Sequence, residues 1–187
     1  MIKIFIDQGH NPRGVNAGAE GNGLYEQDVT YVVGVQLRDL LVATGNYEVK
    51  LSRNEPDEIL GTTNASSLAA RTGAANAWGA DWFISIHANA STIPSASGSE
   101  GYVYSLNSAA LPLARDIIEG ISARTGFPAR GVYARPSLYV LRRTAMPATL
   151  IEIGFITNEA EAYLMGTDPS AFARGMFEGI QRFFGYR

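Results

Sequence analysis

Short apolar runs alternate with amphipathic stretches along the whole chain of 187 residues, and this alternation is the strongest constraint on its fold. A strand that is buried on both faces reads as a continuous apolar run, whereas a helix that covers a sheet carries apolar residues every three or four positions. Strands that alternate with helices favour a parallel sheet with helices on both faces. We therefore predict an α/β fold, a three-layer sandwich with a mostly parallel, twisted central sheet of about six strands flanked by helices.

The same pattern locates the individual elements. The first predicted helix carries apolar side chains between Val29 and Leu41 on one face, and Asp28 is its candidate N-cap. The predicted strands cover residues 1–7, 47–51, 82–86, 101–104, 138–141 and 148–153, and the predicted helices cover residues 29–43, 65–77, 109–125 and 169–184.

The composition excludes several kinds of site and partner. The chain has no cysteine, which rules out a disulfide, a thiolate zinc finger and an iron–sulfur cluster, and it has two histidines, so a catalytic zinc with three protein ligands would need at least one carboxylate. The net charge of −3 and the lack of a basic cluster argue against nucleic acid as a partner. No apolar stretch predicts a membrane span, and one compact domain over residues 1–187 is expected.

Both histidines follow apolar strands. His10 comes shortly after the predicted strand at residues 1–7, and His87 ends the predicted strand at residues 82–86. The carboxyl ends of parallel strands form the functional edge of an open α/β sheet, so two imidazoles at that edge could share a metal ion. A single histidine at a strand end is more often a hydrogen-bonded structural residue, and this alternative stays open for each of them.

The third ligand would be an acidic residue near the same edge of the sheet. Glu26 lies at the entrance of the first predicted helix, although an acid in that position also stabilises the helix dipole without any metal. Glu20 and Asp7 are competing candidates for ligation. Asp7 could instead orient His10 from behind.

Glu152 interrupts an otherwise apolar sequence at residues 148–156. An unpaired carboxylate buried there would carry a large desolvation cost, so its presence needs a reason. One interpretation is a structural ion pair with Arg142 or Arg143. The other is a catalytic carboxylate whose pKa is raised by apolar surroundings.

Several sequence blocks resemble those of the zinc-dependent N-acetylmuramoyl-L-alanine amidases of type 3, which trim bacterial peptidoglycan. The resemblance extends from Ile4 to about Phe183, and the blocks follow one another in the family's order. The blocks are IDQGH (6–10), GLYEQDV (23–29), ADWFISIHANA (80–90) and PATLIEIGFITN (147–158), with SLYVLRRT (137–144) before the last.

The resemblance implies a mechanism and assigns residues to it. His10, Glu26 and His87 would bind one Zn²⁺ per chain, and Glu152 would be catalytic; the preference for Glu26 over Glu20 rests mainly on the resemblance. The implied reaction is hydrolysis of the amide that joins N-acetylmuramic acid to L-alanine in peptidoglycan. Zinc would lower the pKa of its water and polarise the scissile carbonyl.

Other interpretations of the site stay open. Asn89 and Arg142 are weak candidates for substrate contacts, and a turn-forming role explains Asn89 equally well. A carboxypeptidase-like zinc peptidase would use similar ligands, and a non-catalytic peptidoglycan-binding module could keep the same residues for structure. A glycosidase is disfavoured, because paired carboxylates do not explain why both histidines end strands.

The resemblance also implies partners and a location. The sequence shows no insertion of the kind that covers the zinc in some family members, so we expect activity without an obligatory protein activator. The substrate places the protein at the bacterial cell wall. Because no signal peptide precedes the first strand, we expect either a domain excised from an exported enzyme or a lytic enzyme that is made in the cytoplasm and released to the wall.

Overall fold

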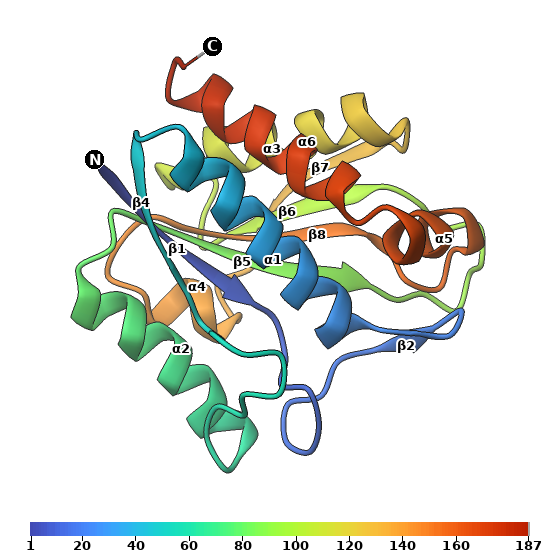
Figure 1. The fold of residues 1–187 in the computed structure, drawn as a ribbon, viewed down its shortest axis with the longest axis horizontal. Coiled ribbons are helices and arrows are strands. Elements are labelled where there is room, and N and C mark those ends of the chain that lie inside the picture. The colour runs from blue at the N-terminus through green and yellow to red at the C-terminus, as the bar shows by residue number, and fades with distance from the viewer. Residues whose placement is uncertain (187) are drawn as a thin grey trace.

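The structure, a computed structural model that describes residues 1–186, is a six-stranded sheet between two layers of helices (Figure 1). The strand order is β4-β1-β5-β8-β6-β7, and every neighbouring pair is parallel except β6 with β8. The predicted three-layer fold with a mostly parallel sheet is confirmed. The strands are β1 (Ile2–Gln8), β4 (Tyr47–Leu51), β5 (Trp82–Asn89), β6 (Ser99–Val103), β7 (Ala129–Ala134) and β8 (Ala148–Phe155), with a separate antiparallel hairpin of β2 (Glu20–Gly21) and β3 (Leu24–Tyr25).

Helices cover both faces of the sheet. Helices α1, α3 and α6 form one layer, and α2 and α4 lie on the opposite side (Figure 1). Helix α5 follows the end of β8. The helices are α1 (Glu26–Ala43), α2 (Asn64–Trp78), α3 (Ala110–Thr125), α4 (Tyr139–Arg143), α5 (Glu159–Thr167) and α6 (Ser170–Phe183).

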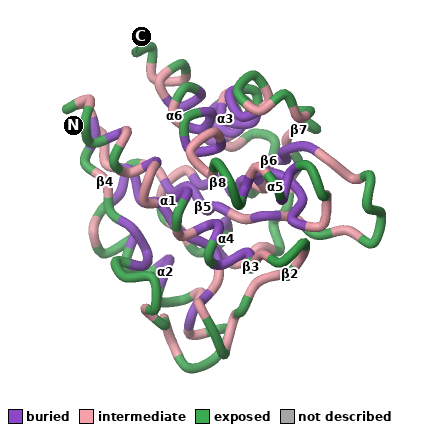
Figure 2. Tube along the Cα trace, turned by 45° about the vertical axis from the view of Figure 1, so that its right-hand side comes forward, coloured by how far each residue is buried: buried purple, intermediate pink, exposed green. Residues whose placement is uncertain are grey.

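Alternate residues of β1 enter two different cores. Ile4 and Ile6 belong to the larger apolar cluster beneath α1, α3 and α6, whereas Phe5 belongs to the smaller cluster beneath α2 and α4. Successive side chains of a strand point to opposite faces, so β1 is buried on both sides and reads as a continuous apolar run. Buried residues are accordingly concentrated in the central strands and on the inner sides of the helices (Figure 2).

The strand predicted at residues 138–141 is wrong, because these residues form the start of α4 and the residue before it. The N–H of Arg142 donates to the carbonyl oxygen of Leu138 at 3.1 Å, which is a helical hydrogen bond. Val140 and Leu141 are buried side by side rather than alternately. A short apolar run does not distinguish a strand from a buried helical turn by its periodicity.

The remaining differences concern short elements and helix ends. The sixth strand of the sheet is β7, for which, as for α5 and the β2–β3 hairpin, the sequence predicted no element. Asp28 is not an N-cap, because α1 begins at Glu26 directly after the hairpin. No helix within residues 1–186 has the length and apolar character needed to cross a bilayer.

Candidate metal centre and active site

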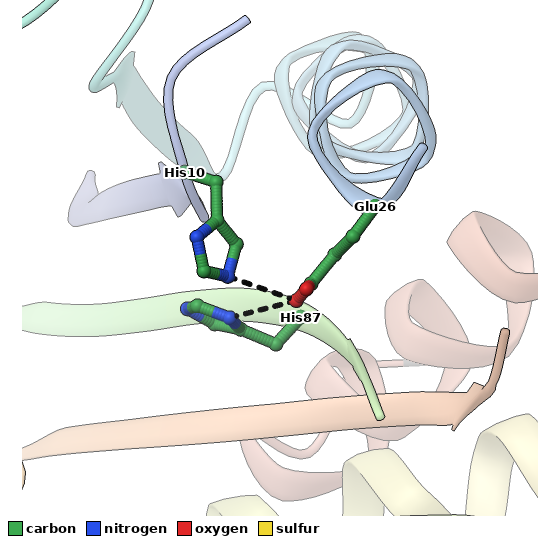
Figure 3. A group of neighbouring side chains, drawn as sticks. All are labelled: His10, Glu26 and His87. Atoms are coloured by element: carbon green, nitrogen blue, oxygen red, sulfur yellow. Dashed lines mark hydrogen bonds and ion pairs between the residues drawn. The ribbon is translucent and has the colours of Figure 1, made fainter. Parts of the chain in front are cut away.

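Three side chains from distant parts of the chain converge at the carboxyl edge of the sheet (Figure 3). His10 follows β1, Glu26 opens α1 and His87 lies near the end of β5. Oε1 of Glu26 lies 3.1 Å from Nε2 of His10 and 3.0 Å from Nδ1 of His87. One donor atom from each residue lies within 4.8 Å of the other two, so the structure brings together the three residues proposed from the sequence as ligands.

The imidazole of His10 is fixed from behind. Its Nδ1 lies 3.2 Å from the carbonyl oxygen of Asn16, which can only accept a hydrogen bond, and its Nε2 faces Oε1 of Glu26. The His10 backbone has a φ of 69°, and its carbonyl oxygen accepts a 2.6 Å hydrogen bond from Nη2 of Arg71. Gly9 lets the ring of His87 lie close to the backbone just before His10, because a Cβ at position 9 would lie 2.6 Å from that ring.

The carboxylate of Glu26 is held in its ionised form. It is buried, and besides the two imidazoles it accepts hydrogen bonds from the N–H groups of Ala88 at 3.0 Å and Ala19 at 2.9 Å. Burial alone would raise the pKa of Glu26, but the hydrogen bonds and charges of His10 and His87 outweigh it and hold the pKa far below its ordinary value.

This donor set fits a zinc ion. Two imidazole nitrogens and one carboxylate oxygen are a usual protein contribution to catalytic zinc sites, which keep a further position open for water or substrate. The hydrogen bond behind His10 is the kind of contact that orients a metal-binding histidine. The chemistry of these side chains therefore agrees with the metal that the sequence implies.

Neither Asp7 nor Glu20, the two competing candidates for the acidic ligand, belongs to the cluster of His10, Glu26 and His87. Asp7 is buried and bonded to Nη1 of Arg71 at 2.7 Å and to the hydroxyl of Ser85 at 2.7 Å, and no hydrogen bond joins it to His10 among the described residues. Glu20 is exposed on β2. Asp7 thus acts on the site through Arg71, which the sequence analysis did not single out.

Replacing Asp7 by asparagine is expected to lower the free energy of unfolding by about 3–5 kcal/mol at pH 7, because it leaves the Arg71 charge buried without a partner. Burial alone would raise the pKa of Asp7, but Arg71 and Ser85 more than offset it and keep the pKa below its ordinary value. The stabilisation is therefore present above the unfolded-state pKa and is lost as the pH falls through the lower folded-state pKa.

Urea unfolding at a series of pH values checks this expectation. The difference between wild type and Asp7→Asn should be constant near neutral pH and shrink below about pH 4. Asp39→Asn makes the same chemical change in an exposed ion pair with Arg38 and should cost at most about 1 kcal/mol. Equal stabilities of the two variants at pH 7 would show that the buried pair does not hold the site together.

Glu152 lies on β8 opposite two residues of the neighbouring strands, His87 on β5 and Glu100 on β6. Its Oε2 is buried and has no hydrogen-bond partner, and no ion pair with Arg142 or Arg143 exists among the described residues. Burial raises the pKa of Glu152 well above its ordinary value, and the negative charges of Glu26 and Glu100 add to this. An unpaired carboxyl group that is easily protonated suits a general acid–base.

Glu100 is an acidic neighbour that the sequence analysis missed. Its carboxylate accepts hydrogen bonds from the hydroxyl of Tyr102 and from Nε of Arg130, so both oxygens are engaged. Glu152 is therefore the carboxyl group of this pair that keeps an oxygen free for another molecule.

The two weaker candidates do not join the cluster. Oδ1 of Asn89 accepts a 2.9 Å hydrogen bond from the N–H of Ala90, which is the turn-forming role that the sequence left open. Arg142 is exposed on α4. Neither side chain has a hydrogen bond or an ion pair with His10, Glu26 or His87 among the described residues.

Comparison with known proteins identifies the family. Residues 4–182 match the family model described as N-acetylmuramoyl-L-alanine amidase. The chain belongs to this amidase family. The predicted enzyme class and its peptidoglycan substrate are thereby confirmed, and the cell wall is the place of action.

Individual relatives agree with this assignment over nearly the whole chain. The N-acetylmuramoyl-L-alanine amidase CwlM of Bacillus licheniformis is 40% identical over 188 residues, which cover 98% of this chain and 69% of that protein. The catalytic domain of the amidase CwlV from Bacillus (Paenibacillus) polymyxa var. colistinus superposes with a TM-score of 0.86 at 28% identity and 100% coverage of both chains. The CwlD amidase from Clostridioides difficile, solved in complex with the GerS lipoprotein, superposes with a TM-score of 0.88 at 26% identity and 99% coverage of both.

Proposed function

We propose that His10, Glu26 and His87 hold one Zn²⁺ ion and that Glu152 is the acid–base of amide hydrolysis. The observation that carries the proposal is the juxtaposition of the three converging donor atoms with the unpaired Oε2 of Glu152, whose strand position is opposite that of His87. A zinc ion bound to these donors would supply water of lowered pKa and would polarise the scissile carbonyl.

The residues of the chain supply the proton transfers and the alignment. Glu152 takes a proton from the attacking water and returns it to the amine of L-alanine as the bond to the lactyl carbonyl of N-acetylmuramic acid breaks. Asn16 and Arg71 keep His10 in one orientation. The raised pKa of Glu152 suits both halves of this cycle, because the group must gain and lose a proton near neutral pH.

We also propose that Arg142 and Asn89 contact the substrate. Arg142 has no ion-pair partner among the described residues, so its guanidinium is available for a carboxylate of the stem peptide. Asn89 lies at the carboxyl end of β5, two residues after His87, where a backbone or side-chain group can reach a bound peptide. Both contacts would orient the substrate rather than take part in proton transfer.

The catalytic unit in this proposal is one domain over residues 1–187 that acts without a protein activator. Within residues 1–186, Glu26 is the only acidic residue that forms an ion pair with either imidazole. No second acidic side chain therefore blocks the nitrogen atoms that would bind the metal. The CwlD relative was solved with a lipoprotein bound, so the requirement for a partner is a specific point to test.

Digestion of purified peptidoglycan by the zinc-loaded chain alone tests the proposal. We expect new L-alanine amino termini and no new reducing sugar ends, measured by mass spectrometry and reducing-end labelling against a sample without enzyme. New amino termini from other residues would indicate a peptidase, and reducing ends would indicate a glycosidase. Binding to the wall without any product would support the non-catalytic module or a need for an activator.

A further inference from the structure

Two adjoining hollows lie near the carboxyl end of β8, between α5 and the turn of the β2–β3 hairpin (Figure 1). Their volumes are about 860 Å³ and about 340 Å³, and Asn22, Glu159 and Tyr163 border both of them. The larger hollow also reaches Pro94 and Thr157, in the loops after β5 and β8. Pockets for drug-sized ligands measure about 300–1,000 Å³, so the larger hollow has room for a disaccharide.

The hollows are close to the proposed active site along two segments of the chain. Thr157 follows Glu152 by five residues, and Asn22 precedes Glu26 by four. An extended chain spans at most about 3.6 Å per residue, so the Cα atoms of these pairs lie within about 18 Å and about 14 Å of each other. Sugar rings attached to a muramic acid at the metal cluster can therefore reach the hollows.

The hollows and Arg142 lie on opposite faces of the sheet. Met165 of α5 packs into the larger apolar cluster beneath α1, α3 and α6, whereas Leu141, next to Arg142 on α4, packs into the smaller cluster. The three metal donors converge at the edge of the sheet between these faces. The scissile amide joins glycan to stem peptide, so a peptide directed to Arg142 leaves the opposite face for the glycan.

The lining of the hollows offers two contacts to a sugar. Tyr163 is 72% exposed, and the face of an aromatic ring carries partial negative charge, which attracts the C–H groups of a pyranose. Nδ2 of Asn22 donates a 2.9 Å hydrogen bond to the carbonyl oxygen of Ile156, and this bond holds the amide in place. Oδ1 of Asn22 has no hydrogen bond among the described residues, so it can accept one from an acetamido N–H or a hydroxyl.

The charge of the lining favours the glycan over the stem peptide. Among the described residues that border either hollow, Glu159 is the only charged one, and it is exposed. Its carboxylate repels an anion, and stem peptides carry free carboxylates. The N-acetylated sugar rings of a glycan strand are uncharged where the lactyl groups are amidated, so they need no contact with Glu159.

We propose that these two hollows bind the N-acetylated sugar rings next to the N-acetylmuramic acid at which cleavage occurs, with Tyr163 as the stacking surface and Asn22 as a hydrogen-bond acceptor. The inference rests on the proposed function, because it requires the lactyl amide to lie at the metal cluster. The substrate then crosses the edge of the sheet, with its glycan at α5 and its stem peptide at α4. The enzyme therefore prefers a muramoyl peptide within a glycan strand to an isolated one.

The first test measures sugar binding without turnover. The probe is an uncharged tetrasaccharide of N-acetylglucosamine, titrated by calorimetry into wild type and variants. Tyr163→Ala should raise its dissociation constant by about tenfold, whereas Tyr163→Phe keeps the ring and should bind it like wild type. Asn22→Gly removes the acceptor and tolerates the left-handed backbone, where φ is 50°, and should weaken binding by about two- to tenfold.

The second test compares two substrates that carry the same stem peptide. One is an isolated N-acetylmuramoyl peptide, and the other is that unit within a short glycan strand. The kcat/KM of wild type should be about tenfold or more higher for the strand, and Tyr163→Ala should lose most of this preference.

Two control variants separate stacking from surface and charge effects. Tyr104→Ala removes a tyrosine that is 48% exposed, borders neither hollow and follows β6 at the opposite edge of the sheet, so it should match wild type in both tests. Glu159→Gln removes the charge beside the hollows and should bind the uncharged tetrasaccharide like wild type. A changed affinity in this variant would contradict the argument from charge.

The outcomes distinguish this inference from the proposed function. Equal affinities of wild type and Tyr163→Ala for the tetrasaccharide would overturn the inference, as would no binding to wild type or an equal strand preference in the two proteins. Wild type that cleaves neither substrate would instead contradict the proposed function, and the binding test would still decide whether the hollows receive sugar rings.

Discussion

Replacing Glu152 by glutamine is expected to lower kcat for peptidoglycan hydrolysis by about 10²–10⁴-fold, the usual contribution of a positioned general acid–base. Glutamine keeps the shape of the side chain but can neither accept the proton of the attacking water nor return one to the leaving amine. The residue is not among the three metal donors, so zinc content should stay at the wild-type value.

The thermal stability of Glu152→Gln distinguishes a catalytic role of this residue from a purely structural one. Oε2 of Glu152 is buried without a hydrogen-bond partner, and a buried unpaired carboxyl group costs free energy in the folded state. Removing its charge should therefore leave the melting temperature unchanged or raise it. A residue kept only for structure would show the opposite combination, with lower stability and little direct effect on kcat.

The measurement is kcat and KM on a soluble muropeptide, with zinc by atomic emission and thermal unfolding in parallel. Glu159→Gln makes the same change at an exposed glutamate on α5 and should match wild type in all three. A Glu152→Gln protein that keeps wild-type kcat would exclude this residue as the acid–base. Loss of zinc would show that the carboxyl group helps to bind the metal.

The fold could be predicted from the sequence wherever a periodic pattern was long enough. Strands β1, β5 and β8 are buried on both faces, so their apolar runs are unmistakable, and α3 and α6 show clear helical spacing. The exposed edge strand β7 has no such pattern. Its sequence, ARGVYA, contains an arginine and a glycine, and its burial is at most partial.

The two histidines of the candidate metal site were predictable because strand ends have a fixed place in this architecture. His10 follows β1 and His87 lies near the end of the neighbouring parallel strand β5, so β1–β5 pairing brings both histidines to the same edge of the sheet. The choice between Glu20 and Glu26 depends on the β2–β3 hairpin, which separates them. Glu20 is exposed on β2, whereas Glu26 is buried at the start of α1. Local pattern does not resolve that choice, and the family resemblance was needed.

The supporting residues were harder to find. Arg71 lies on the buried face of α2, four residues from both Ser67 and Ala75, so a charged side chain in a buried stripe was a signal that the sequence offered. Its partner is not visible from sequence, because Asp7 lies 64 positions away. Long-range ion pairs of this kind become clear once the strand order is known.

Replacing His10 by alanine is expected to abolish stoichiometric zinc binding. The chain has two histidines, and both are in the cluster, so no spare imidazole can take the vacant place. Losing a group behind a ligand already costs about 10–100-fold in metal affinity, and losing the ligand itself should cost more. His87→Ala should behave in the same way, because its Nδ1 approaches the same carboxylate oxygen.

Zinc titrations followed by thermal unfolding test this expectation. At zinc concentrations about 100 times the dissociation constant, binding stabilises the folded wild type by about 2.7 kcal/mol, whereas the variant should show no shift at that concentration. Full stoichiometric zinc in His10→Ala would require another ligand near the same edge. Asp7 is a poor replacement because it neutralises the buried Arg71, and moving it to the metal would leave that charge unpaired. Retention of zinc would therefore mean that the metal binds elsewhere, and the assignment of Glu26 and His87 would fail with that of His10.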